Sequence, residues 1–173
     1  MENILKEKLK KIKLFAMDVD GTLTDGKVYY SRDGEELKAF CIRDGMGIEL
    51  LHHYGIQTCI ITTETSQIVT SRAMKLKIDH VMLGSKDKLK DLKELSSELN
   101  ISLEEIAYIG DDINDIQALE GVGFSACPSD AIKYVKEKVD YICSNSGGSG
   151  AVREVIELIL LAQEKEIVFP NNR

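Results

Sequence analysis

The residues most suited to chemistry are two aspartates that follow an apolar run near the start of the chain. Residues 15–26 read FAMDVDGTLTDG, so a single valine separates Asp18 from Asp20 before the chain turns. Two carboxylates this close repel each other and resist burial when both are ionised. A bound cation would remove that cost, so the pair predicts a cation site at the end of a strand.

Other reactive side chains follow other strand-like segments. Thr62, Thr63 and Glu64 come after one apolar run, Lys86 and Lys88 open the helix-like segment after the next, and GDDINDI follows a third with Asp111, Asp112, Asn114 and Asp115. The carboxyl ends of parallel strands meet at one edge of a sheet, where sites form. We therefore expect these groups to converge on one rim.

The converging carboxylates are Asp18, Asp20, Asp111, Asp112 and Asp115. Five such groups cannot all ionise together without a cation. Oxygen donors without histidine or thiolate suit Mg²⁺, which shares its coordination sphere with phosphate. With a lysine and a hydroxyl on the same rim, the sequence predicts a Mg²⁺ site that holds a phosphoryl group.

Short strands alternating with amphipathic helices must position these residues. Strands are expected at 14–18, 57–62, 80–83, 107–110, 123–126 and 141–143, and helices at 45–54, 66–75, 86–99, 113–120, 130–137 and 151–163, after a short amphipathic helix at the start. This alternation predicts an α/β fold, a Rossmann-like parallel sheet flanked by helices. Residues 27–30 and 36–40 flank the turn-like SRDG, which predicts a projecting β-hairpin within 27–40.

Length and composition narrow the class of protein. The 173 residues predict one domain over 1–173, with 164–173 as a loose C-terminal tail. A net charge of −7 and the absence of a basic stripe argue against a nucleic-acid partner. No run approaches the ~20 apolar residues of a membrane span, and the lysine-rich start lacks the apolar core of a signal peptide. Four scattered cysteines indicate reduced thiols, so we expect a cytoplasmic protein with no membrane partner.

Four of these segments, in this order, resemble the motifs of the haloacid dehalogenase superfamily of phosphotransferases. They are DVDGTLTDG, the strand end at Thr62, Lys88 and GDDINDI. The resemblance implies that Asp18 is the nucleophile and that Asp20 protonates the leaving group and then activates water. It also implies that Thr62 binds the phosphoryl oxygens and that Lys88 balances charge.

The same resemblance implies how Mg²⁺ is held and how the site is covered. Asp18, the backbone carbonyl of Asp20 and Asp111 would bind the ion, with Asp112 or Asp115 in support. Members of the superfamily usually carry a cap domain, but this chain has room there only for the hairpin and one helix. The site would be open unless a neighbouring subunit closes it.

Two further segments resemble the 3-deoxy-D-manno-octulosonate 8-phosphate phosphatases, capless enzymes of lipopolysaccharide sugar biosynthesis. They are FCIRDGMGI at 40–48 and SGGSGAVREVIELIL at 146–160. This resemblance implies a phosphorylated sugar acid as substrate, with Arg43 and Asp44 near the sugar and the loop of Gly147 and Gly148 folding over it. It implies a homotetramer in which the hairpins pack together and a neighbour helps to line the site.

One departure keeps the substrate open. The second motif of that family commonly reads T-G-R, where this chain has Thr62-Thr63-Glu64. Glutamate would repel an anionic sugar carboxylate, and Glu64 with Lys75 resembles instead the branch that acts on nine-carbon ulosonate 9-phosphates. Arg43-Asp44-Gly45, by contrast, resembles the eight-carbon enzymes, so we expect the eight-carbon substrate.

Other classes of function remain alternatives. They are a phosphoacceptor signalling module, a catalytically silent oligomerisation domain and a phosphatase of nucleic-acid ends. Receiver modules lack an aspartate two residues beyond the phosphoacceptor, which distinguishes them from a chain with Asp20. The intact Asp18, Lys88 and Asp111 count against a silent domain, and the acidic composition counts against nucleic acid.

Overall fold

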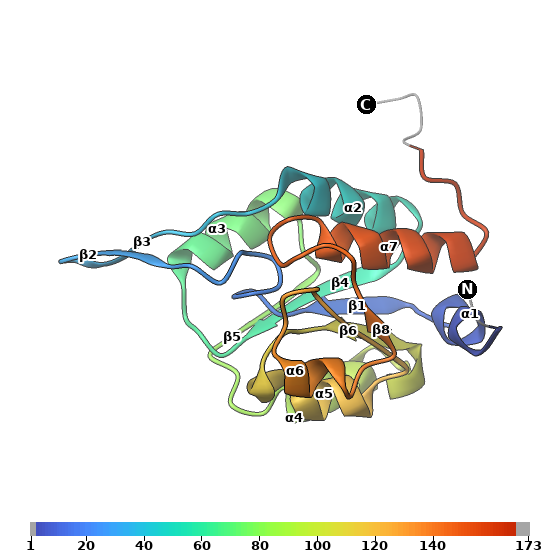
Figure 1. Cartoon of the computed structure of the whole chain (residues 1–173). Coiled ribbons are helices and arrows are strands. Elements are labelled where there is room, and N and C mark those ends of the chain that lie inside the picture. The colour runs from blue at the N-terminus through green and yellow to red at the C-terminus, as the bar shows by residue number, and fades with distance from the viewer. Residues whose placement is uncertain (1–2, 169–173) are drawn as a thin grey trace.

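A computed structural model describes residues 3–168, and its centre is a parallel sheet between two layers of helices (Figure 1). The sheet order is β5-β4-β1-β6-β7-β8. The strands are β1 (Leu14–Met17), β4 (Gln57–Thr62), β5 (His80–Leu83), β6 (Ile106–Ile109), β7 (Phe124–Cys127) and β8 (Tyr141–Ile142). The predicted α/β sheet is confirmed, with strand ends that differ from the expected ones by at most one residue.

The helices form two layers with separate apolar cores. They are α1 (Asn3–Lys10), α2 (Ile42–His53), α3 (Gln67–Leu76), α4 (Lys88–Glu98), α5 (Ile116–Gly121), α6 (Lys133–Lys136) and α7 (Ala151–Ala162). Helices α2, α3 and α7 cover one face, and α4, α5 and α6 cover the other (Figure 1). Phe15 of β1 is buried in the first core and Leu14 in the second, because successive side chains of a strand point to opposite faces.

Local hydrogen bonds set where the helices begin. The Ser66 hydroxyl caps α3 by accepting from the Val69 N–H, and the Asp87 carboxylate caps α4 by accepting from the Lys90 N–H. The helix expected at 86–99 therefore starts at Lys88. The helix expected at 113–120 is divided into a 3₁₀ turn, Ile113–Asp115, and α5, because Asp112 and Asp115 form a capping box at its start.

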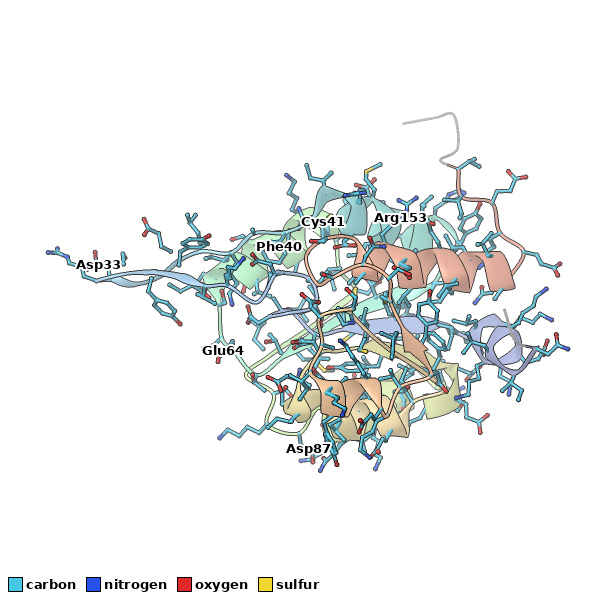
Figure 2. All side chains as sticks on the ribbon, in the orientation of Figure 1. Asp33, Phe40, Cys41, Glu64, Asp87 and Arg153 are labelled. Carbon is cyan, nitrogen blue, oxygen red and sulfur yellow. The ribbon has the colours of Figure 1, made fainter. Side chains whose placement is uncertain are left out.

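The hairpin predicted within residues 27–40 projects beyond the sheet, and no cap domain is found within residues 3–168 (Figures 1 and 2). Strands β2 (Tyr29–Ser31) and β3 (Gly34–Leu37) pair antiparallel, with Asp33 at the tip. Gly34 has a φ of +121°, which favours glycine after the turn. Tyr29, Tyr30 and Leu37 are exposed, so the hairpin carries apolar side chains on a thin projection.

The chain after α7 returns to the body of the protein as far as it is described. Lys165 donates its backbone N–H to Leu160 at 2.9 Å, and the Tyr54 hydroxyl donates to the Glu166 carbonyl at 2.8 Å. The rest of the predicted tail, residues 169–173, lies outside the described residues. None of the helices within residues 3–168 has the length and apolar character needed to cross a membrane.

Candidate active site

Asp18, Lys88 and Asp115 meet at the rim formed by the carboxyl ends of β1, β4 and β6. The backbone N–H of Asp18 donates to the Ile109 carbonyl of β6 at 3.0 Å, which fixes the turn after β1 to the sheet. Lys88 begins α4, and its buried ammonium donates to Asp18 Oδ1 at 2.6 Å and to Asp115 Oδ1 at 2.5 Å. Residues that are far apart in the sequence thus form one buried ionic cluster.

Asp115 is held by hydrogen bonds on both carboxylate oxygens. The Tyr108 hydroxyl donates to Oδ1 at 2.6 Å, beside Lys88. The backbone N–H groups of Asp111 and Asp112 donate to Oδ2 at 3.0 and 3.2 Å. With four donors already in place, Asp115 is suited to orienting the fourth motif and Lys88 more than to binding an ion directly.

Three carboxylates gather closely enough to hold a metal ion. Asp18, Asp111 and Asp115 each place one oxygen within 4.8 Å of the others. Thr22 orients Asp111 by donating to its Oδ1 at 3.0 Å. Gly21 has a φ of +88°, and a Cβ at that position would overlap the Asp111 carboxylate, so only glycine leaves room for it. This all-oxygen donor set fits Mg²⁺.

The electrostatics of the cluster also favour a cation. Burial and the nearby Asp115 charge raise the pKa of Asp18 to about 8, although Lys88 opposes the shift. Burial and Asp115 raise the pKa of Asp111 to about 6. Burial alone would lower the pKa of Lys88, but Asp18 and Asp115 raise it above its usual value, so the lysine stays charged. One ammonium does not balance the surrounding carboxylates.

Asp20 lies beside this cluster and contacts the base of the hairpin. Its carboxylate is 26% exposed and forms an ion pair through Oδ1 with the Lys38 ammonium, whose side chain is only 1% exposed. Lys38 also pairs with Glu35 at 3.1 Å. The hairpin is therefore joined directly to one of the two aspartates of the first motif.

A cleft of about 260 Å³ opens over Asp18 and Asp20. Its other lining residues are Val28, Tyr30, Glu35, Lys38, Thr62, Thr63, Glu64, Asp112 and Asn114. Thr62 is buried at the end of β4, and Glu64 is exposed on the following loop, at the edge of the sheet from which the hairpin projects (Figure 2). Asp112 is exposed and caps the 3₁₀ turn by accepting from the Ile113 N–H at 2.7 Å. Of the predicted catalytic residues, Asp18, Asp20 and Thr62 share this opening with Glu64, whereas Lys88 does not line it.

Three residues predicted to bind substrate lie on helices and do not line this cleft. Arg43 is exposed in the first turn of α2, and Lys75 is exposed in the last turn of α3. Asp44 is buried, and its Oδ1 accepts from the backbone N–H of Arg153 at 2.8 Å. That bond joins α2 to the first turn of α7, so Asp44 has a structural contact within the chain.

Gly147 and Gly148 lie against the turn that follows β1. Gly148 donates its N–H to the Thr22 carbonyl at 3.0 Å, and Gly147 donates to Asp130 Oδ1 at 2.9 Å. A Cβ on Gly147 would overlap the Gly21 carbonyl. The two glycines therefore permit a close backbone contact that supports the first motif from outside the cleft.

Sequence reasoning missed Tyr108 and Lys38. Tyr108 lies in the apolar run IAYIG before the fourth motif, where a phenolic ring reads as ordinary core. Its position two residues before Gly110 places it on the strand that enters the site, which is the one available signal. Lys38 lies in the hairpin, where a lysine usually faces solvent, and nothing local indicates its partner 18 positions earlier.

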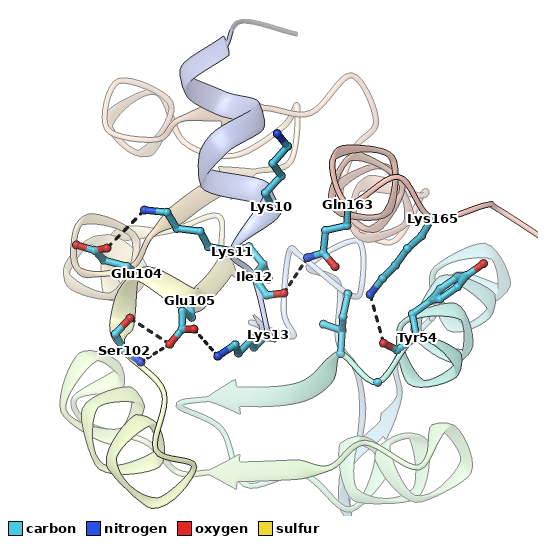
Figure 3. A pocket seen from close by; sticks show the side chains of 12 residues that line it. Lys10, Lys11, Ile12, Lys13, Tyr54, Ser102, Glu104, Glu105, Gln163 and Lys165 are labelled. Atoms are coloured by element: carbon cyan, nitrogen blue, oxygen red, sulfur yellow. Dashed lines mark hydrogen bonds and ion pairs between the residues drawn. The ribbon is translucent and has the colours of Figure 1, made fainter.

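Another cleft, of about 610 Å³, lies at the opposite edge of the sheet (Figure 3). Its rim carries Lys10, Lys11, Lys13 and Lys165. Lys13 pairs with Glu105 at 2.6 Å and Lys11 with Glu104 at 3.8 Å, so much of this positive charge is already balanced. The residues of the four motifs are absent from its lining, which separates it from the candidate active site.

Comparisons with known proteins agree with the geometry. A family model described as haloacid dehalogenase-like hydrolase matches residues 52–156. The 3-deoxy-D-manno-octulosonate 8-phosphate phosphatase of Escherichia coli K12 is 42% identical over 91% of this chain and 84% of its own length. The Moraxella catarrhalis phosphatase of the same name, solved with magnesium, phosphate and KDO, has a TM-score of 0.92 and 45% identity over 95% of this chain and 94% of that one. A cobalt-bound Haemophilus influenzae relative has a TM-score of 0.88 and 40% identity over 91% of this chain and 92% of that one.

Proposed function

The chain belongs to the haloacid dehalogenase-like hydrolases, in the family of the 3-deoxy-D-manno-octulosonate 8-phosphate phosphatases, and from that membership we propose its reaction. It is a Mg²⁺-dependent phosphomonoester hydrolase that converts 3-deoxy-D-manno-octulosonate 8-phosphate to 3-deoxy-D-manno-octulosonate and phosphate. The observation that carries this function is the cluster in which Lys88 joins Asp18 to Asp115 beside Asp111.

Asp18 is the nucleophile of the proposed reaction. One of its carboxylate oxygens attacks phosphorus, and the bond between phosphorus and the C8 oxygen breaks, which gives an aspartyl phosphate and the free sugar. Lys88, 2.6 Å from Asp18 Oδ1, keeps the carboxylate oriented and offsets charge on the phosphoryl group. Thr62, at the end of β4 and in the same cleft, donates its hydroxyl to a phosphoryl oxygen.

Asp20 handles the proton in both steps. Its carboxylic acid protonates the departing C8 alkoxide, and its carboxylate then takes a proton from the water that attacks phosphorus. The second attack breaks the bond to Asp18 and releases inorganic phosphate. Because related ATPases carry threonine at this position, an aspartate here predicts rapid hydrolysis of the intermediate.

Mg²⁺ held by Asp18, Asp111 and the backbone carbonyl of Asp20 would neutralise the charge that develops on the phosphoryl oxygens. Thr22 and Gly21 place Asp111 for this role, and Asp115 supports the site through its hydrogen bonds to the backbone of Asp111 and Asp112. The carboxylates whose pKa burial raises are those that a divalent cation would stabilise in the ionised form.

The nine-carbon ulosonate 9-phosphates are the second candidate substrates. Glu64 lines the cleft and would repel a sugar carboxylate that approached it. The eight-carbon substrate requires its carboxylate to lie away from Glu64. Arg43 and Asp44, with Gly147 and Gly148, stay proposed substrate contacts that would need a neighbouring subunit or a shift of the loop, since they do not line this cleft.

We propose a homotetramer assembled through the hairpin. Tyr29, Tyr30 and Leu37 expose apolar surface on the hairpin, and Tyr30 also lines the cleft, so packing there would cover apolar side chains and narrow the opening. Four cysteines, all within residues 3–168, form no disulfide bonds, which supports a cytoplasmic enzyme; they are Cys41, Cys59, Cys127 and Cys143.

Measuring phosphate release from the eight- and nine-carbon substrates, with Mg²⁺ and with EDTA, tests the proposal. We expect Mg²⁺-dependent release, with the higher kcat/KM for the eight-carbon substrate. Asp18→Asn is the matched control for contaminating phosphatase. A higher kcat/KM for the nine-carbon substrate would make it the proper substrate. Release that EDTA does not lower, or that Asp18→Asn retains, would overturn the proposed mechanism.

A further inference from the structure

We propose that Lys38 is a positioning residue through which the hairpin holds Asp20 in place for proton transfer. The inference rests on the proposed function, in which Asp20 is the general acid and base. It assigns to the hairpin a role inside its own subunit, in addition to any role in assembly.

The first observation is the depth of Lys38. It directly follows β3 and leaves the hairpin toward the body of the protein, and its side chain is only 1% exposed. A buried ammonium is costly unless it is paired with anions. Lys38 meets that requirement with two carboxylates, Asp20 and Glu35. The lysine therefore has a defined place and is not a solvated side chain of the hairpin.

The second observation is that the network continues into the helix beyond β4. The other carboxylate oxygen of Glu35 accepts from the Ser66 hydroxyl. Ser66 also caps α3, so it is fixed by the helix. Lys38 is thus held through Glu35 to a rigid element, and a rigid support is what a positioning residue needs.

The third observation concerns the two oxygens of Asp20. Oδ1 accepts from Lys38, whereas Oδ2 is buried and has no hydrogen-bond partner among the residues that the structure describes. An unsatisfied buried oxygen is unfavourable in a resting protein, so such an atom calls for an explanation. This division leaves Oδ2 free to carry the proton to the leaving oxygen and then to accept one from the attacking water, while Lys38 anchors Oδ1. Without Lys38, the carboxylate would lose the one anchor that the described residues give it.

A positioning role and a purely structural role for Lys38 predict different results for two substrates whose leaving groups differ in their need for a proton. An alkyl phosphate needs a proton from Asp20 to leave, whereas p-nitrophenolate departs as a stable anion. Since kcat/KM reports the first irreversible step, the transfer to Asp18, loss of proton delivery lowers this constant for the sugar phosphate only. A loosened fold or a damaged Mg²⁺ site would lower it for both substrates.

The experiment compares wild type with Lys38→Met and with a control, Lys27→Met. Lys27 is an exposed lysine near the hairpin that pairs with Asp25. For Lys38→Met we expect kcat/KM for the sugar phosphate to fall about 100-fold. For p-nitrophenyl phosphate we expect kcat/KM to fall by less than about 5-fold. We also expect a burst of p-nitrophenol, because hydrolysis of the aspartyl phosphate needs Asp20 and becomes slow in this variant. Lys27→Met should match wild type with both substrates.

A double-mutant cycle keeps the test decisive if Lys38→Met weakens the fold. Adding Lys38→Met to Asp20→Asn should cost less than about 3-fold in residual sugar-phosphate turnover, because residues that act through each other are not additive. Equal losses with both substrates, or a full 100-fold loss in the Asp20→Asn background, would overturn the role of Lys38. Inactivity of the wild-type enzyme toward both substrates would instead refute the proposed function.

Discussion

Removing the hydroxyl of Tyr108 should lower the free energy of unfolding by about the contribution of one buried, charge-assisted hydrogen bond. Tyr108 is fully buried on β6, and its hydroxyl donates to Asp115 Oδ1 at 2.6 Å. A hydrogen bond to a charged group contributes about 1.5–3 kcal/mol. Phenylalanine keeps the ring in place, so Tyr108→Phe creates no large cavity. Phenylalanine also leaves no buried hydroxyl without a partner, so the cost is mainly that of the lost hydrogen bond. We therefore expect the free energy of unfolding to fall by about 2 kcal/mol.

Urea denaturation of the metal-free protein measures this effect. We expect a lower transition midpoint with an unchanged m value, because the surface exposed on unfolding stays the same. In a thermal scan a loss of about 2 kcal/mol corresponds to a Tm lower by about 4–8 °C for a chain of this size. Tyr134→Phe is the matched control, since Tyr134 is 55% exposed on α6.

The same variant should remain an active enzyme. Asp115 keeps its bond to Lys88 and the two backbone N–H groups, so we expect kcat to fall by less than about 10-fold. A loss of stability below about 0.5 kcal/mol, or one equal to that of Tyr134→Phe, would refute the claim that the Tyr108 hydroxyl stabilises the charged cluster.

Three further predictions follow from the same cluster. Asp18→Asn should lower kcat by ~10³-fold or more. The metal-free variant should nevertheless have a Tm at pH 8 no lower than that of wild type, because it removes a carboxylate whose charged form burial disfavours. A lower Tm would contradict the raised pKa of Asp18. The folded-state pKa of Asp18 is about 8, above its unfolded value, so below pH 8 the folded protein holds a proton that the unfolded protein has released. The stability that this proton gives is lost as the pH rises toward 8. Mg²⁺ should therefore raise Tm more at pH 8 than at pH 6, and an equal or smaller shift at pH 8 would contradict the raised pKa. Gly21→Ala should weaken Mg²⁺ binding in a calorimetric titration because its Cβ would displace Asp111, whereas Gly55→Ala, at a positive φ with open space around it, should not; equal affinity in both variants would argue against the role of Gly21.

The sequence allowed the sheet and the clustering of the charged residues at its rim to be predicted, because both leave local patterns. Asp18 and Asp111 each follow an apolar strand, and parallel strands of alternating α/β units bring their carboxyl ends together. The hairpin could also be predicted, since two short strand-like runs flank a set of turn residues. These features depend on neighbours in the chain.

The contacts that complete the site depend on distant residues and were not predictable. The partner of Lys38 is set by how the hairpin folds back onto the turn after β1, and that geometry has no sequence signature. The sequence predicts a loop over the substrate at Gly147 and Gly148. It does not indicate that Gly148 donates to the Thr22 carbonyl, a contact between segments far apart in the chain.

Trapping the covalent intermediate tests the central claim most directly. The enzyme is mixed with 3-deoxy-D-manno-octulosonate 8-phosphate and Mg²⁺, quenched in acid within one turnover, reduced with borohydride and analysed by peptide mass spectrometry. Reduction converts a phosphorylated aspartate to homoserine, and we expect this product at Asp18 only when both substrate and Mg²⁺ are present. Homoserine at Asp20 or Asp111, with none at Asp18, would contradict nucleophilic catalysis by Asp18.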